Sequence, residues 1–209
     1  MKRRRFSPPP RHAAPRRAER GVTLIVVLLI LVVVTLVGLG AAQLALLGER
    51  STRYDRDYLV ASQAAEAALM DAEFDIRGPN TGTGNRVADF SQEYGDSLFA
   101  VGCGTTSRTR GLCIPAPDGS KPVWATVDFL ATGATAPSVG FGEFTGRAFP
   151  VGSGVMPALA PRYIIEIVDD KPVGGSATSV KKMYRITAIG FGPREDIQVV
   201  MQIAFRKEG

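Results

Sequence analysis

Two adjoining stretches decide the fold of this chain: GVTLIVVLLILVVVTLVGLGAAQLALLG at residues 21–48 and ERSTRYDRDYLVASQAAEAALMDAEFDIR at residues 49–77. The first has 28 consecutive residues without a charged side chain. A helix of that length reaches about 42 Å, which exceeds the roughly 30 Å hydrocarbon core of a bilayer. The run is also longer than the apolar region of a secretory signal peptide, usually about 7–15 residues. We therefore expect it to cross a membrane, and a plain membrane anchor is one interpretation of it.

The second stretch continues the helix with a different pattern. It contains neither Gly nor Pro, and it is rich in Ala, Glu, Leu and Arg, which favour helix. Gly78-Pro79-Asn80 ends the pattern, so we predict one continuous helix from about Val22 to Arg77. Small or apolar side chains recur every three or four residues, and this stripe is expected to pack on a folded domain. The residues of the stripe are Tyr54, Tyr58, Ala61, Ala65, Leu69, Ala72 and Ile76.

Basic residues are concentrated at the start of the chain. Residues 1–20 carry eight Lys or Arg against one Glu, whereas the whole chain of 209 residues has 25 basic and 20 acidic residues. The rest of the chain therefore has 17 basic and 19 acidic residues, which argues against nucleic-acid binding by the folded body. The positive-inside rule places the basic head in the cytoplasm and the C-terminal body across the membrane.

Residues 79–209 are expected to form a β-rich domain. Gly and Pro are frequent there, and the segments 97–101, 123–130, 162–168, 181–189 and 196–205 have the β-branched and aromatic content of strands. Alternate residues of the last segment make one face almost wholly apolar, and the helical stripe is its natural cover. We predict an α+β fold, an antiparallel sheet packed on the second half of the long helix, with a loop excursion at about 131–160.

Residues able to support catalysis or bind a metal are few. The single histidine, His12, lies in the basic head, so residues 21–209 have no histidine for a catalytic triad or a zinc site. We expect no enzymatic activity, no cofactor and no transition-metal site. Asp169 and Asp170, with Glu166 nearby, could either hold calcium or form a solvated hairpin end.

The two cysteines also leave two interpretations open. Cys103 and Cys113 are separated by nine residues, and no other cysteine is present. In an oxidising compartment such a pair closes a short loop as a disulfide, whereas in a reducing one it would be two free thiols. The expected outward orientation of the body favours the disulfide. The spacing is not that of a Cys-x-x-Cys redox motif.

The order of these segments resembles the type IV prepilins, which have a basic leader, a Gly, an apolar helix and an amphipathic extension. RGVTLIVVLL at residues 20–29 is similar to the N-terminus of PilX-type minor pilins, and QAAEAALMDAE at residues 63–73 to a stretch common in that family. YRITAIGFG at residues 184–192 and QVVMQ at residues 198–202 resemble its last two strands. The resemblance implies a minor pilin that helps initiate type IV pilus assembly and sits in the tip complex.

The same resemblance implies a processing site and a set of partners. A prepilin peptidase would cleave between Gly21 and Val22, and the new amine of Val22 would be methylated. The chain would then consist of a leader (1–21), a transmembrane half-helix (22–48), an amphipathic half-helix (49–78) and a periplasmic domain (79–209). The implied partners are other minor pilins, the major pilin, a PilY-type tip adhesin and, before assembly, the inner membrane.

One position departs from the usual pilin pattern. Most pilins have Glu at the fifth mature position, where it meets the N-terminal ammonium of a neighbouring subunit, and that position here is Val26. Because a buried charge needs a partner, this subunit cannot neutralise a neighbour's amine in that way. The departure favours the pilus tip over the shaft. The alternative is a pseudopilin of a type II secretion system, because the tip subunit of that system also lacks the Glu.

Cleavage of the leader is directly testable. We expect the protein recovered from sheared pili to begin at Val22 with a methylated amine, because the basic head meets the apolar helix at Gly21 as in prepilin peptidase substrates. Mass spectrometry of the N-terminal peptide measures both features. An intact leader on assembled protein would contradict the pilin interpretation.

Overall fold

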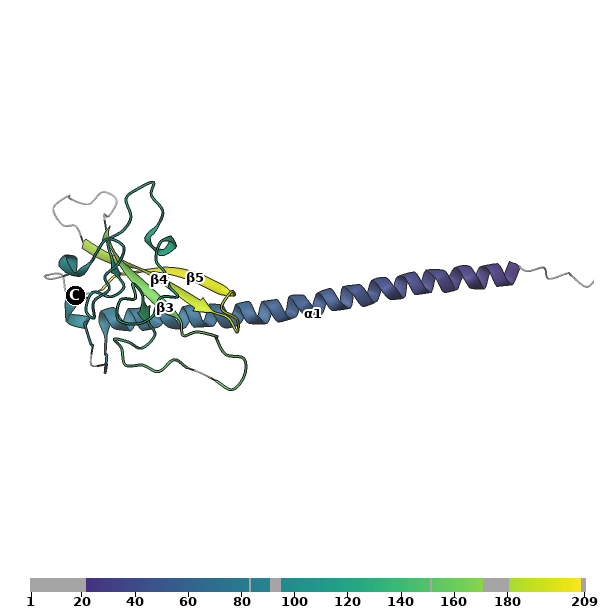
Figure 1. Ribbon diagram of the computed structural model, residues 1–209, viewed down its shortest axis with the longest axis horizontal. Coiled ribbons are helices and arrows are strands. Elements are labelled where there is room, and N and C mark those ends of the chain that lie inside the picture. The colour runs from purple at the N-terminus through teal and green to yellow at the C-terminus, as the bar shows by residue number, and fades with distance from the viewer. Residues whose placement is uncertain (1–21, 83, 91–94, 151, 171–180, 208–209) are drawn as a thin grey trace, which may run out of the picture. The chain divides into compact units, whose positions relative to one another are not determined.

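The computed structural model describes residues 22–82, 84–90, 95–150, 152–170 and 181–207. A single helix, α1, runs from Val22 to Arg77 (Figure 1). The chain divides into two compact units, residues 1–50 and 51–209, and α1 contributes residues to both. The prediction of one continuous helix is confirmed, because no Gly-Pro break occurs before Gly78.

The second half of α1 packs on a sheet of five strands, ordered β1-β3-β4-β5, with β2 also paired to β3. The three long strands β3 (Arg162–Asp170), β4 (Lys181–Phe191) and β5 (Gln198–Phe205) are antiparallel neighbours. The short strand β1 (Leu112–Cys113) runs parallel to β3, and β2 (Val139–Gly140) runs antiparallel to it. The layout is therefore the predicted α+β arrangement, with a mixed sheet in place of a purely antiparallel one.

Two of the five predicted strands are wrong. Segment 97–101 contains the end of a 3₁₀ helix at Gly95–Leu98 and a single bridge from Ala100 to Cys113. Segment 123–130 begins with a 3₁₀ helix at Val123–Ala125, and its apolar residues fill a core instead of pairing in the sheet. β-branched and aromatic side chains suit any buried surface, so their content alone does not distinguish these two cases.

The two faces of the sheet carry separate cores. The face toward α1 holds Tyr163, Ile165, Ile186 and Ala188, which pack with Leu69 and other helix residues. The opposite face is covered by the segment that contains the cysteines and the 3₁₀ helix at Val123–Ala125. Its buried residues are Cys103, Cys113, Val123, Phe129, Ile164, Ile189 and Phe191. The alternation of odd and even residues along β3 and β4 follows from the pleat of a strand buried on both faces.

Five residues of the predicted helical stripe lie in the core: Ala61, Ala65, Leu69, Ala72 and Ile76. Of the four stripe positions from Ala61 to Ala72, three are Ala, and only Leu69 has a larger side chain. At Gly190 of β4 an added Cβ would lie 2.0 Å from the carbonyl oxygen of Ala61 and 2.3 Å from the nitrogen of Ala65. Helix and strand thus meet backbone to backbone at this point.

The prediction that Tyr54 and Tyr58 belong to the packed stripe is wrong. Tyr54 is 60% exposed and Tyr58 is 47% exposed. β4 ends at Phe191, and an added Cβ on the next residue, Gly192, would lie 3.1 Å from the carbonyl oxygen of Asp57. The sheet therefore leaves the helix near Asp57. Tyr54 lies beyond that point, and Tyr58, the residue after Asp57, projects from the last covered turn to solvent.

The contact at Gly190 predicts the effect of a single methyl group. Gly190→Ala should lower the free energy of unfolding by about 3 kcal/mol, because the methyl meets rigid backbone atoms on two helical residues. Chemical denaturation of the full chain in detergent, followed by tryptophan fluorescence, measures the change. Gly152→Ala is the matched control, since an added Cβ there meets nothing within 4 Å. Equal stability of the two variants would contradict the close approach.

Candidate functional site

The N-terminal half of α1 is an apolar surface without a cover in the described part of the chain. All its large apolar side chains from Val22 to Leu47 are exposed, including Val26 at 48%. The helix is long and apolar enough to cross a membrane by length and composition. The one hydroxyl on its middle turns, Thr35, donates to the carbonyl oxygen of Val32 at 2.8 Å, so it adds no unsatisfied polar group.

Of the residues predicted to take part in processing and assembly, the structure describes Val22 and Val26. Val22 is the first residue of α1, and Val26 lies on its second turn. Gly21 lies outside the described residues. The roles of Gly21, Val22 and Val26 in cleavage, methylation and assembly therefore stay predictions.

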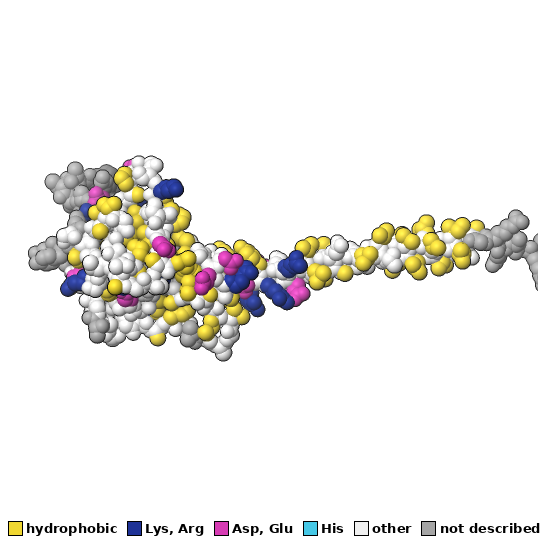
Figure 2. Space-filling view, in the orientation of Figure 1, with side chains coloured by type: hydrophobic (Ala, Val, Ile, Leu, Met, Phe, Trp, Pro, Cys, Tyr) yellow, Lys and Arg dark blue, Asp and Glu magenta, His cyan; other side chains and the backbone are white. Residues whose placement is uncertain are grey.

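A charged collar follows the apolar half of α1. It is formed by Glu49, Arg50, Arg53, Asp55, Arg56 and Asp57, and Figure 2 shows these basic and acidic side chains gathered on the helix. Arg56 and Asp57 form an ion pair at 3.1 Å, with the Arg56 side chain mostly exposed. Exposed pairs of this kind add little stability. Charged side chains are unfavourable in an apolar environment. The collar therefore marks the end of the part of α1 that such an environment can surround.

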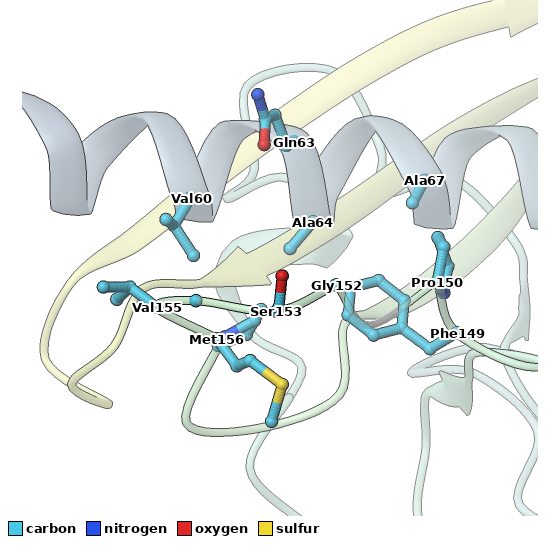
Figure 3. Close-up of a pocket in the computed structure, with 12 residues that line it drawn as sticks. Val60, Gln63, Ala64, Ala67, Phe149, Pro150, Gly152, Ser153, Val155 and Met156 are labelled. Atoms are coloured by element: carbon cyan, nitrogen blue, oxygen red, sulfur yellow. The ribbon is translucent and has the colours of Figure 1, made fainter.

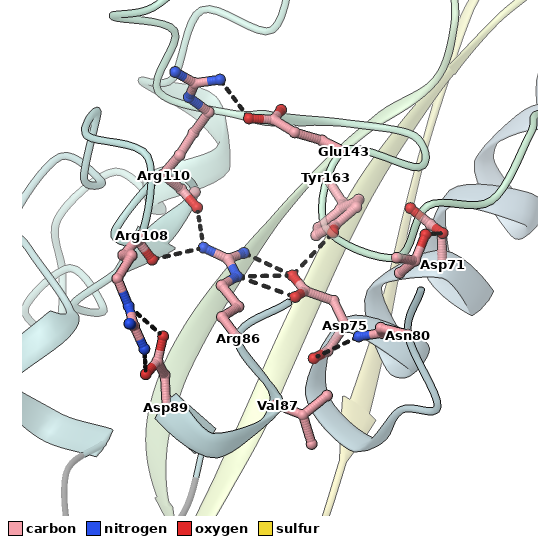
Figure 4. Close-up of polar contacts among 12 residues, drawn as sticks. Asp71, Asp75, Asn80, Arg86, Val87, Asp89, Arg108, Arg110, Glu143 and Tyr163 are labelled. Carbon is pink, nitrogen blue, oxygen red and sulfur yellow. Dashed lines mark hydrogen bonds and ion pairs between the residues drawn. The ribbon is translucent and has the colours of Figure 1, made fainter. Parts of the chain in front are cut away.

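Asp75, near the C-terminal end of α1, belongs to a buried ion pair that no sequence pattern indicates. Asp75 and Arg86 are both 0% exposed and lie 2.6 Å apart (Figure 4). The Arg86 guanidinium also donates to the carbonyl oxygens of Arg108 at 3.0 Å and Arg110 at 2.7 Å. The hydroxyl of Tyr163 donates to Asp75 at 2.9 Å. One helical carboxylate thus connects α1 to β3 and, through Arg86, to the loop before β1.

Burial makes this pair costly to break. The Arg86 guanidinium also lies 3.7 Å from the centre of the Phe144 ring, a cation–π contact shielded from water. Burial, followed by the charge of Asp75, raises the pKa of Tyr163 well above its usual value. Tyr163 therefore stays a hydrogen-bond donor to the carboxylate at every physiological pH. The network is structural, because each polar group is used by another group of the same chain.

Asp71, one turn earlier on α1, holds a second loop. Its carboxylate accepts the backbone N–H of Gly142 at 2.7 Å and also the hydroxyl of Thr145. Burial raises the pKa of Asp71, and the two hydrogen bonds partly oppose that rise. Asp71 and Asp75 are four residues apart on the buried face, a spacing in QAAEAALMDAEFD that could have been recognised as a paired helix-to-loop attachment.

The other candidate groups take structural roles. Cys103 and Cys113 form a disulfide, and the loop it closes contains Arg108 and Arg110, whose carbonyl groups receive Arg86. The three carboxylates considered for calcium each have a separate basic partner. Asp169 pairs with Lys182 at 2.7 Å, Asp170 with Arg206, and Glu166 with Arg185 at 2.6 Å. No group of three metal-binding side chains occurs among the residues that the structure describes.

A shallow groove of about 300 Å³ runs beside α1 (Figure 3). One wall is helical and the other is the segment that follows Phe149. Among the described residues that line it, the polar side chains are Gln63 and Ser153, so no acid or base stands beside the Ser153 hydroxyl to activate it for catalysis. The helical residues that line it are Val60, Gln63, Ala64 and Ala67.

Substitution of Arg86 tests how much the buried ion pair contributes to the stability of the fold. Arg86→Met is expected to lower the free energy of unfolding by about 3–5 kcal/mol, because it leaves the Asp75 carboxylate buried without its cation. The double variant Asp75→Asn with Arg86→Met should lose less than Arg86→Met alone. Arg56→Met, which removes an exposed pair on the same helix, is the control and should change stability by less than about 1 kcal/mol. Denaturant unfolding measures all three, and equal losses for Arg86→Met and Arg56→Met would contradict the role of the buried pair.

Comparison with known families is consistent with this geometry. A family model described as "Type IV pilus assembly protein PilX C-term" matches residues 97–207, and one described as "PilX N-terminal" matches residues 20–69. No curated protein and no solved structure matches the chain. The first model alone covers more than half of the chain, and the second covers the apolar half of α1 and part of the packed stripe. The chain therefore belongs to the PilX family of type IV pilus minor pilins, which are structural components of the pilus.

Proposed function

We propose that this subunit helps initiate type IV pilus assembly and occupies the tip complex of the filament. The observation that carries the proposal is Val26, an exposed apolar side chain at the position where most pilins have Glu. The family match favours a pilus over the alternative, a type II secretion pseudopilin. The finer placement at the tip rests on the chemistry of this one position.

The physical reason lies in the N-terminal amine of each mature subunit. Inside a filament of packed apolar helices, an ammonium group without a counter-charge costs several kcal/mol. A shaft subunit needs a carboxylate to meet the amine of its neighbour, and Val26 supplies none. The first subunit of a filament has no earlier neighbour whose amine must be neutralised. Val26 is therefore tolerated at the tip and unfavourable in the shaft.

The proposed location follows from the two halves of α1. The leader, residues 1–21, stays in the cytoplasm, and residues 22–48 span the inner membrane until the subunit is extracted. The same apolar surface is then buried among neighbouring helices, because water is an unfavourable environment for it. The body lies in the periplasm before assembly, where oxidation of Cys103 and Cys113 is favourable.

The partners we propose are those that such a position requires. Other minor pilins and the major pilin contact the apolar half of α1, and a PilY-type adhesin sits above the body at the tip. A prepilin peptidase acts at Gly21 and Val22 before assembly. Each of these contacts is with a protein, and no cofactor is part of the proposal.

Stoichiometry tests the tip location. In sheared pili we expect this chain to be far less abundant than the major pilin, because only one end of each filament can hold it. Quantitative mass spectrometry gives the ratio. A ratio near one would overturn the assignment to the tip.

The role in initiation is tested by counting pili. Deletion of the gene should reduce the number of pili per cell, and the wild-type gene should restore it. Val26→Leu is the matched variant, and it should restore piliation equally, since an apolar side chain at this position is sufficient. Unchanged pilus number in the deletion strain would contradict a role in initiation.

A further inference from the structure

Strand β5 forms an open edge of the sheet (Figure 1). It pairs with β4 over its whole length, from Phe191 opposite Gln198 to Tyr184 opposite Phe205. Within the described part of the chain, its backbone groups make no hydrogen bond to any segment other than β4. An edge of this kind is a template for pairing with another strand.

The free backbone groups of β5 can be assigned to particular residues. The N–H of Gly192 donates to the carbonyl oxygen of Ile197 at 2.7 Å, so residues 192 and 197 form a hydrogen-bonded pair just before the strand begins. Antiparallel ladders alternate between hydrogen-bonded and non-hydrogen-bonded pairs. The odd-numbered residues of β5 therefore bond to β4, and the outward groups belong to Gln198, Val200, Gln202 and Ala204.

The edge has none of the usual protections against pairing. Its sequence, QVVMQIAF, contains no charged residue, no Pro and no Gly over eight residues. On the helix side, Met201, Ile203 and Phe205 are only partly buried against the core. On the other side, Val200 is 39% exposed. Natural edge strands of this length normally carry a charge, a Pro or a bulge.

We propose that β5 pairs with β5 of a second copy of this chain, antiparallel and centred on Met201. Outward groups must meet outward groups, so only even-numbered residues can form hydrogen-bonded pairs across the new interface. In the proposed register Val200 pairs with Gln202 of the second copy, and Gln198 with Ala204. The eight outward N–H and C=O groups of each strand are then all used. Each Met201 lies opposite its own counterpart.

The charges at the two ends of β5 favour a second copy over an unrelated strand. Glu195 and Asp196 precede the strand, and Arg206 and Lys207 follow it. In the register centred on Met201, the turn that carries Asp196 comes to the end of the strand at which Arg206 of the second copy lies. Both side chains are mostly exposed, and their partners within one copy, Arg194 for Asp196 and Asp170 for Arg206, can be exchanged for the second copy. The same complementarity repeats at the other end because the interface has two-fold symmetry.

The apolar side chains match in the same register. Val199 lies opposite Ile203 of the second copy, on the face covered by α1. Pairing would complete the burial of side chains that the monomer leaves partly open. Parity allows several registers, but only the one centred on Met201 pairs all four outward residues of both strands.

The symmetry also fixes the direction of the second copy. The two-fold axis of two adjacent antiparallel strands is perpendicular to the sheet, so it reverses the packed half of α1 between the copies. Subunits of one filament share a direction because they assemble head to tail. If the proposed function holds, the pairing therefore joins copies carried by different filaments.

Cysteine crosslinking of the purified full chain in detergent tests the pairing and its register. Met201→Cys should form a covalent dimer under mild oxidation, since opposed residues of a non-hydrogen-bonded pair lie within reach of a disulfide. Val199→Cys and Ile203→Cys are matched controls from the same face. Each should crosslink several-fold less when alone, but a mixture of the two should crosslink well. The native cysteines do not compete, because they are joined to each other.

Val200→Pro in the Met201→Cys background separates edge pairing from folding. It removes one outward N–H and leaves the bonds to β4 intact, so the fold should persist while the crosslinked fraction falls several-fold. Circular dichroism checks the fold. Equal crosslinking at all three cysteine positions, no dimer, or a dimer unaffected by the proline would each overturn the proposal. The assay needs no pilus, so its failure is distinguishable from failure of the proposed function.

Discussion

The approach of α1 to β4 at Gly190 is the constraint on which the rest of the body depends. With no side chain between the two backbones, the helix can lie on the sheet only where its own residues are also small, at Ala61 and Ala65. That contact sets the rotation of the helix about its axis. The later turns then direct Leu69, Ala72 and Ile76 into the same core.

The same rotation buries two carboxylates, and the loops are organised around them. Asp71 and Asp75 cannot reach water, so each requires donors from another part of the chain. Asp75 receives Arg86 and Tyr163, and Asp71 receives Thr145 and Gly142. Segments with little regular structure are thereby attached to the helix. The body consequently depends on the second half of α1 for polar partners as well as for apolar cover.

Sequence patterns predicted the parts of this protein that repeat and missed those that depend on distant contacts. The helix is indicated by the length of the uncharged run and by the spacing of the stripe. The last strand is indicated by the alternation in residues 196–205. The same period could not show that the sheet ends near Asp57, so Tyr54 and Tyr58 were assigned to the stripe. Strands β1 and β2 have two residues each, too few for any period. Arg86 lies in a loop without a pattern, and only the fold brings it to Asp75. The apolar half of α1, residues 22–48, is in contrast a continuous segment that the sequence alone identifies.

The exposed tyrosines of α1 have a consequence for how the chain sits in a lipid bilayer. Tyr54 and Tyr58 follow the uncharged run on the same helix, interleaved with Arg50, Arg53 and Arg56. Tyr rings and basic side chains are the groups that favour the headgroup region of a membrane. If residues 22–48 span a bilayer, as proposed, this aromatic and basic anchor holds the subunit at a defined depth. In that arrangement, the residues that the sheet leaves uncovered contact lipid headgroups instead of protein.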